Sequence, residues 1–154
     1  MRARIDRRYS EERAEAVPWA DAEERLGAAE VAWIVTVRPD GRPHATAMVP
    51  VADVGRVYFH AGSTEVKYAN IEANARVLVL AGDTGWDHRL DVAVEGTAVP
   101  VTDEAVLLRV AERYRGRWQL EDPRRRRRAD PDRAYGHAKG EPFGQTTYRK
   151  GEAS

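Results

Sequence analysis

The charged side chain that stands out first in this sequence is Lys67. It is the only lysine among the first 138 residues, and only Lys139 and Lys150 follow it, although lysine and arginine together number 25. Because the chain otherwise uses arginine, we expect this isolated lysine to make a specific contact rather than to be one more solvated residue. It lies in the first turn of a helix predicted over residues 65–73, after a Gly-Ser-Thr loop at 62–64.

Two other kinds of chemistry lack support. His88 with Asp87 and Asp91 could suggest a metal site, but no second histidine lies at ligand spacing, so we expect no metal. Ser63 has neither a nucleophile-elbow motif nor a recognisable base, which argues against serine hydrolysis. The absence of cysteine excludes disulfides and thiol nucleophiles.

Five consecutive arginines, Arg124 to Arg128, are the feature that would suit a nucleic acid or another polyanion. However, 25 basic residues are balanced by 25 acidic ones, and no aromatic residues interleave with the run as stacking platforms would. We interpret residues 119–133 as an arginine-rich mobile loop. Nucleic acid is therefore not an expected partner, and polyanion binding stays as an alternative.

The elements that must position these side chains are mostly strands. Runs of β-branched and aromatic residues between turn signals predict an antiparallel meander that closes into a small barrel, with a bulge at Gly96. Apolar stripes predict helices, with Asp21, Ser63 or Thr64, and 102–104 as their caps. The expected strands cover residues 31–37, 43–51, 57–60, 76–80, 90–101, 134–138 and 143–149, and the helices cover 21–29, 65–73 and a segment after 104.

The length of 154 residues suits one domain, for which we expect the bounds 18–150, preceded by a charged N-terminal arm over 1–17. No apolar run approaches the roughly eighteen residues of a membrane helix, and the N-terminus has no signal-peptide pattern. We therefore expect a cytoplasmic protein without a membrane partner.

Several segments in the right order make the chain resemble the pyridoxamine-phosphate-oxidase-like flavin/deazaflavin oxidoreductases. The resemblance runs over residues 18–149 and is carried by segments 18–21, 33–44, 57–59, 67–77, 94–103 and 140–146. It implies a mainly β (α+β) fold, a split β-barrel with peripheral helices. It also implies a homodimer that holds FMN or the deazaflavin F420 in clefts at the subunit interface.

The resemblance also implies where a cofactor would lie. Its ring and ribityl chain would lie along one strand, its phosphate would face the loop after the next strand, and Lys67 would be the phosphate cation, aided by the N-terminus of the following helix. Independently of the resemblance, Trp86 lies in a glycine-rich loop and is the one aromatic residue that could cover the ring from the partner subunit, with a plain surface aromatic as the equal alternative. The other residues are Met48, Val49 and Pro50 for the ring and ribityl chain, His60, Ala61, Gly62 and Ser63 for the phosphate, and Asp91, which stands where related oxidases carry a glutamine.

Ala69 stands where family members often carry a second phosphate-side arginine, which favours F420 over FMN. The leading hypothesis is hydride transfer between reduced F420 and a small conjugated substrate, with the protein supplying orientation and water exclusion. An FMN-dependent oxidoreductase and a non-catalytic flavin, deazaflavin or tetrapyrrole-binding module are the alternatives. No catalytic residue is assigned, because the proton for the acceptor could come from solvent, His60 or Tyr148.

Overall fold

The computed structural model describes residues 1–115 and 126–151. Within these residues the chain forms nine strands, three α-helices and one short 3-10 helix. The strands are β1 (Arg2–Ile5), β2 (Ala32–Val37), β3 (Pro43–Met48), β4 (Val51–Asp53), β5 (Arg56–His60), β6 (Arg76–Ala81), β7 (Leu90–Pro100), β8 (Arg126–Ala138) and β9 (Gly144–Arg149). The helices are α1 (Trp19–Ala28), α2 (Val66–Ala73), α3 (Glu104–Arg115) and the 3-10 helix η1 (Arg7–Tyr9).

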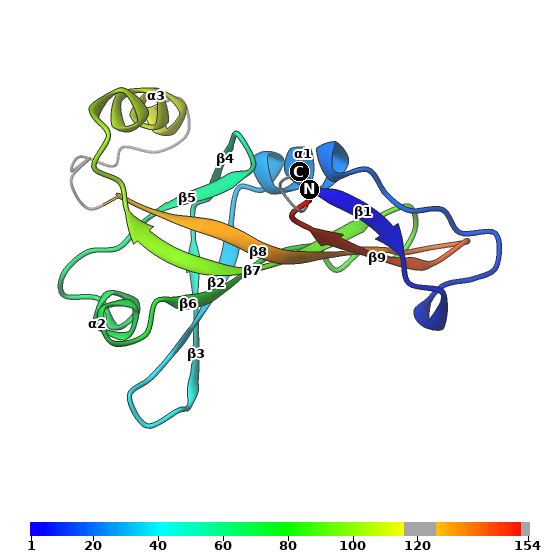
Figure 1. The fold of residues 1–154 in the computed structure, drawn as a ribbon, viewed down its shortest axis with the longest axis horizontal. Helices are drawn as coiled ribbons and strands as arrows, with labels where there is room; N and C mark the ends of the chain where they lie inside the picture. The colour runs from blue at the N-terminus through cyan, green and yellow to red at the C-terminus, as the bar shows by residue number, and fades with distance from the viewer. Residues whose placement is uncertain (116–125, 152–154) are drawn as a thin grey trace.

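The sheet is antiparallel and organised around the long strands β7 and β8, which cross the centre of the molecule (Figure 1). Its main order is β1-β9-β8-β7-β6-β2-β3. The first residues of β8 also pair with β5, which in turn pairs with β4, whereas the last residues of β8 pair with β9. The predicted fold class, a split β-barrel of the α+β type, is confirmed.

Gly96 creates the predicted bulge in the β7–β8 ladder. The register shifts between Glu95 and Gly96, where these residues face Arg133 and Pro131. A Cβ atom at Gly96 would collide with the carbonyl oxygen of Asp130. Only glycine leaves room for this close approach of two backbones, which accounts for the residue found there.

The predicted strand over 43–51 is wrong in its continuity, because it is divided into β3 and β4. Pro50 stands in the break and has no N–H to offer a ladder. After the turn at Val54 and Gly55, which both have positive φ angles, β5 pairs with β4 on one side and with β8 on the other. The additional pairing with β8 begins the second side of the barrel.

The mobile loop predicted over 119–133 is also wrong where the structure describes it, since residues 126–133 belong to β8. Arg126 and Arg127 are buried, and the Arg126 guanidinium lies over the Tyr114 ring at 3.8 Å from its centroid. Arg127 pairs with Glu72 at 2.6 Å. These contacts let arginines occupy a strand, as their long stems can be buried while the charge keeps a partner. Residues 119–125 lie outside the described residues.

The charged segment 1–17 contributes to the sheet, since β1 pairs with β9 from Arg2↔Arg149 to Ile5↔Thr146. Helix α1 begins two residues earlier than predicted, after Pro18 rather than at an Asp21 cap. Its expected apolar stripe is confirmed, because Ala22 and Leu26 are fully buried.

Two apolar clusters hold the elements together. The larger one fills the barrel between the sheet and helices α1 and α2, and the smaller one lies under α3, where the predicted Asp103 cap accepts a hydrogen bond from Val106 N–H at 3.0 Å. Helix α3 therefore packs on β4 and β5, where its buried residues Val110 and Tyr114 join Val51 and Tyr58 in the smaller cluster. Among the described residues, none of the helices has the length and apolar character needed to cross a membrane.

Candidate functional site

Helix α2 turns a polar face toward the protein. Lys67, Asn70 and Ile71 are its buried side chains, at the i, i+3, i+4 spacing of one helix face. The apolar residues Val66, Ala69 and Ala73, which belong to the pattern that predicted this helix, are all exposed. Because a buried lysine and asparagine need partners, this face has to be satisfied by specific contacts.

Asn70 fixes the helix to strand β2. Its side-chain amide donates a hydrogen bond to the Thr36 hydroxyl at 2.9 Å, and both residues are buried. The same hydroxyl lies 3.4 Å from the His44 carbonyl oxygen on β3. This contact sets the rotation of α2 and so determines the direction in which Lys67, one turn earlier, projects.

Lys67 and the loop before it converge on one carboxylate oxygen. Glu65, at the N-cap position of α2, accepts a hydrogen bond from Gly62 N–H at 2.9 Å through Oε2, and the same oxygen pairs with Lys67 Nζ. The expected caps Ser63 and Thr64 are both exposed, and no side chain caps the helix. A backbone N–H and a buried ammonium directed at one oxygen are the donor set that binds an anion.

The predicted ring-side residues 48–50 lie beside the end of β5. The β4–β5 pairing places Val51 opposite Tyr58, so that the chain before β4 runs next to the last residues of β5. The Tyr114 hydroxyl, on α3, lies within hydrogen-bond distance of the carbonyl oxygens of Val49 (2.9 Å) and Tyr58 (3.0 Å). No feature of the sequence indicated this polar contact of Tyr114, which joins three elements that are distant along the chain.

His60, Ala61 and Gly62 continue from β5 toward the Glu65–Lys67 contact. Ala61 is buried, and a Cβ atom placed at Gly62 would lie 3.7 Å from His60 Cε1 and 3.6 Å from the Glu65 side chain. The structure therefore brings residues 48–50, residues 60–62 and Lys67 to one region. We call this region the phosphate-side cluster.

Trp86 and Asp91 are not part of this cluster within one chain. Helix α2 is followed by β6, whose first residue, Arg76, pairs with Thr97 on β7. Asp91 lies on β7 too, six residues before Thr97. At a rise of about 3.3 Å per residue, this separation amounts to roughly 20 Å. The two groups of predicted residues therefore lie toward opposite ends of β7.

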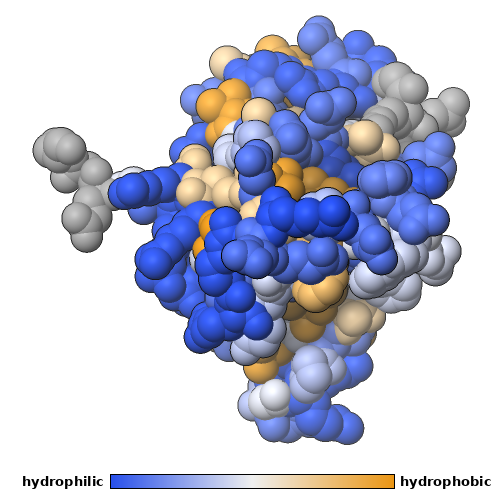
Figure 2. All heavy atoms as spheres, turned by 90° about the vertical axis from the view of Figure 1, so that its right-hand side faces the viewer, coloured by the Kyte–Doolittle hydropathy of each residue, from blue (hydrophilic) through white to orange (hydrophobic). Residues whose placement is uncertain are grey.

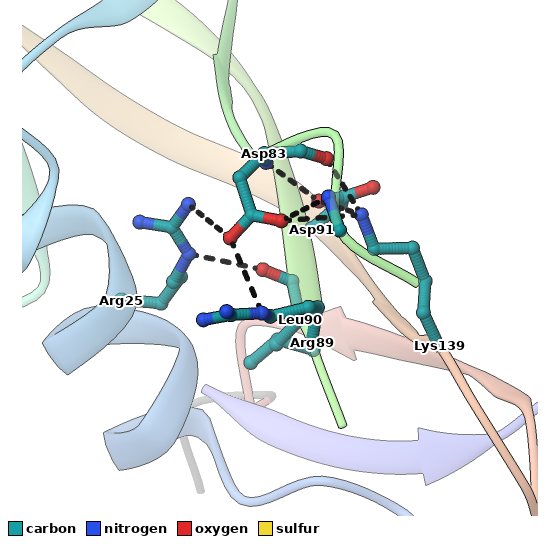
Figure 3. Close-up of polar contacts among 7 residues, drawn as sticks. Arg25, Asp83, Arg89, Leu90, Asp91 and Lys139 are labelled. Atoms are coloured by element: carbon teal, nitrogen blue, oxygen red, sulfur yellow. Dashed lines mark hydrogen bonds and ion pairs between the residues drawn. The ribbon is translucent and has the colours of Figure 1, made fainter. Parts of the chain in front are cut away.

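Asp91 has a defined set of contacts at its own end (Figure 3). Its Oδ1 accepts a hydrogen bond from Asp83 N–H at 3.2 Å and lies 3.0 Å from Lys139 Nζ. Lys139 also donates to the Asp83 carbonyl oxygen at 2.7 Å, and Arg25 donates to the Leu90 carbonyl oxygen at 3.1 Å. The contacts of Asp83 fasten the start of the loop over residues 82–89 to β7 and to the residue that follows β8, and the Arg25 contact ties α1 to β7.

A cavity of about 280 Å³ opens beside Asp91. The exposed aromatic side chains of Tyr9, Trp86 and Phe143 line it together with Lys139. Figure 2 faces this end of the molecule and shows a mostly hydrophilic surface with apolar atoms between the charged side chains. A wall of aromatic groups suits a flat ring, which is the shape that Trp86 was predicted to cover.

Ala69 does not face the phosphate-side cluster, although its position was expected to be one from which an arginine would reach the phosphate. It follows Lys67 by two residues, which places it about 200° around the helix, and it is exposed. An arginine at this position would begin on the solvent side of α2, whereas Lys67 begins on the buried side. Within one chain, the presence of alanine at this position therefore gives no reason to favour F420 over FMN.

The arginine run has internal partners where the structure describes it. Arg126 contacts Tyr114, Arg127 pairs with Glu72, and Arg128 pairs with Asp130 at 2.9 Å. Arg124 and Arg125 lie outside the described residues. Arg126 and Arg127 thus join β8 to α3 and α2, whereas Arg128 is paired within β8, and the three described side chains do not form an open cationic surface. Over residues 1–115 and 126–151, no group of three or more histidine, aspartate or glutamate side chains is arranged to hold a metal.

Comparison with known proteins places this geometry in context. The family described as pyridoxamine 5'-phosphate oxidase matches residues 18–141, which is most of the chain. No curated protein matches the sequence.

Solved structures share the fold. A conserved hypothetical protein from Mycobacterium tuberculosis is 26% identical with a TM-score of 0.66, over 82% of this chain and 89% of that one. An FAD binding protein from Mycobacterium smegmatis is 24% identical with a TM-score of 0.63, over 80% and 96%. A pyridoxamine 5'-phosphate oxidase-related, FMN binding protein from Nostoc punctiforme is 16% identical with a TM-score of 0.60, over 88% and 92%.

Proposed function

Because the chain belongs to the pyridoxamine 5'-phosphate oxidase family, we propose that it is a flavin-dependent oxidoreductase with its cofactor phosphate at the phosphate-side cluster. The observation that carries this proposal is the convergence of Gly62 N–H and buried Lys67 on one carboxylate oxygen. A phosphate oxygen accepts hydrogen bonds from the same kinds of donor as a carboxylate oxygen, so Gly62 and Lys67 fit a flavin phosphate. The similarity to FMN- and FAD-binding structures supports a flavin as the ligand.

Each part of the cluster has a role in this proposal. Lys67 neutralises the phosphate, Gly62 donates its N–H, and residues 48–50 with His60 and Ala61 form the wall along the rest of the cofactor. Tyr114 holds the Val49 carbonyl oxygen and so keeps that wall against β5. When bound, a flavin supplies the hydride-transfer chemistry, and the protein supplies orientation and exclusion of water. A small conjugated molecule is the substrate class we propose.

FMN is the first candidate cofactor, and the deazaflavin F420 is the second. F420 is retained as a candidate cofactor because Glu65 adds a negative charge beside the Gly62 and Lys67 donors. An FMN phosphate is a monoester that carries up to two charges, whereas the phosphate of F420 is a diester that carries one. A nearby carboxylate repels the doubly charged group more strongly.

We also propose that two copies associate through the outer face of β2 and β6. Trp33, Val35, Leu78 and Leu80 alternate with the core residues of these strands, and Trp33 lies opposite Leu80 while Val35 lies opposite Leu78. Trp33 is 52% exposed and the other three are half-buried. A solvated sheet face is normally polar, so this apolar face indicates a covered surface. In such a dimer, Trp86 and Asp91 of the partner subunit can complete the cofactor cleft.

A fluorescence titration of the purified protein with FMN, riboflavin and F420 tests the proposal. We expect one flavin bound per chain, with FMN tighter than riboflavin because only FMN offers a phosphate. Tighter binding of F420 than of FMN would make the deazaflavin the cofactor, and binding of none of them would reject the assignment. Reduced cofactor should then be oxidised by conjugated enones or quinones, whereas binding without turnover would indicate a carrier.

A further inference from the structure

Glu65 occupies both donors of the phosphate-side cluster, the Gly62 N–H and the Lys67 ammonium. Its Oε2 engages both Gly62 N–H and the Lys67 ammonium, so the carboxylate takes the position and the charge of a ligand oxygen. The Lys67 side chain is 8% exposed, so its ammonium is a buried cation. The Glu65 carboxylate that pairs with it balances this charge. A cofactor phosphate would need the same two donors.

The Glu65 side chain has room to leave this position when another anion takes its place beside Lys67 and Gly62. It is 41% exposed, so its carboxylate has solvent to move into. The contacts that hold the residue in place are made by its backbone: its N–H donates to Gly62 O at 3.0 Å, and its carbonyl oxygen accepts from Tyr68 N–H at 3.0 Å. A rotation of the side chain alone would therefore open the donors, and helix α2 would keep its first turn.

We propose, on the basis of the flavin site proposed above, that Glu65 is a specificity-determining residue. Its carboxylate competes with the cofactor phosphate for Gly62 N–H and Lys67, and it repels a phosphate bound beside it. The effect lowers the affinity for flavins that carry a phosphate and leaves flavins without one unaffected. Glu65 thus decides which phosphate-bearing cofactor the site accepts.

The substitution Glu65→Gln tests this competition. Glutamine keeps the length of the side chain and an acceptor for Gly62 N–H, but it removes the charge. Glu104→Gln is the matched control, because Glu104 is an exposed glutamate at the start of α3, on a different helix. The dissociation constants of wild type and both variants are measured for FMN and for riboflavin, and circular dichroism checks the fold.

We expect Glu65→Gln to bind FMN about tenfold more tightly, as removal of a like charge beside a bound anion should produce. Riboflavin affinity should stay unchanged, and Glu104→Gln should match wild type for both flavins. Weaker FMN binding, or an equal change for both flavins, would overturn the inference, since Glu65 would then serve mainly to hold the loop. If only the Glu65→Gln variant bound FMN, and wild type and Glu104→Gln did not, the inference would be supported strongly. Binding of neither flavin by any of the three proteins would overturn the proposed function and the inference with it.

Discussion

The guanidinium carbon of Arg126 lies 3.8 Å from the centroid of the Tyr114 ring, and both side chains are fully buried. The contact joins the last turn of α3 to the first residue of β8. The Tyr114 hydroxyl on the same ring lies near the Val49 and Tyr58 carbonyl oxygens. One tyrosine thus connects α3 with the start of β8 and with the wall of the phosphate-side cluster.

Burial raises the pKa of Tyr114 from 10.0 to about 12, and it raises the pKa of Tyr148 similarly. The neutral forms are therefore favoured by folding. The resulting stability is fully present below pH 10, and it is lost as the pH rises from about 10 to about 12, by roughly 3 kcal/mol at most for each tyrosine. Chemical denaturation across this range measures the loss. Tyr114→Phe should show a smaller loss than wild type, whereas Tyr9→Phe, at an exposed position, should not differ from it.

Lys67→Ala should weaken FMN binding by about tenfold to a hundredfold, because hydrogen bonds to charged groups contribute about 1.5–3 kcal/mol. Lys150→Ala is the matched control, since Lys150 is exposed just beyond β9. Equilibrium titration by flavin fluorescence measures both variants. Equal affinity of Lys67→Ala and wild type would show that the phosphate lies elsewhere.

Thr36→Val should lower the free energy of unfolding by about 1–3 kcal/mol, because it leaves the buried Asn70 amide without its acceptor. Thr36→Ser keeps the hydroxyl and should lose less. Urea denaturation measures both variants. FMN affinity should fall in Thr36→Val as well, since Asn70 orients the face of α2 that carries Lys67. A valine variant as stable as wild type would mean that the contact contributes little.

Gly96→Ala should destabilise the protein by about 1–3 kcal/mol, the range for forced overpacking, since its Cβ would collide with the Asp130 carbonyl oxygen. Gly27→Ala in α1 is the opposite case: its Cβ would lie 3.6 Å from the Ala52 Cβ, which is an ordinary contact. Alanine also favours helix by up to about 1 kcal/mol over glycine. Thermal unfolding should therefore give a lower Tm for the first variant and an equal or higher Tm for the second.

Trp33→Asp should shift the protein from dimer to monomer, because it places a charge in the apolar outer face of β2. Val54→Asp adds the same charge in the β4–β5 turn, where Val54 is 73% exposed, and should leave the association unchanged. Sedimentation velocity distinguishes the two species. A monomeric wild type would contradict the proposed dimer before either variant is made.

Patterns of neighbouring residues predicted most of the local structure. The β-branched runs of β2, β6 and β7, the bulge at Gly96 and the Asp103 cap are set by neighbouring residues, so their patterns could be read directly. The sequence also singled out Lys67 by its rarity. The family resemblance, carried by short segments in order, predicted the split β-barrel that the structure has.

Which distant groups meet depends on the tertiary fold and could not be predicted from local patterns. Arg126 and Arg127 belong to a strand because Tyr114 and Glu72, from two different helices, supply their partners, and no local pattern contains that information. Charge and hydropathy taken alone predict a solvated loop there. For the same reason the rotation of α2, set by the Asn70–Thr36 hydrogen bond, could not be predicted from its apolar residues, and it is this rotation that buries Lys67 beside Gly62.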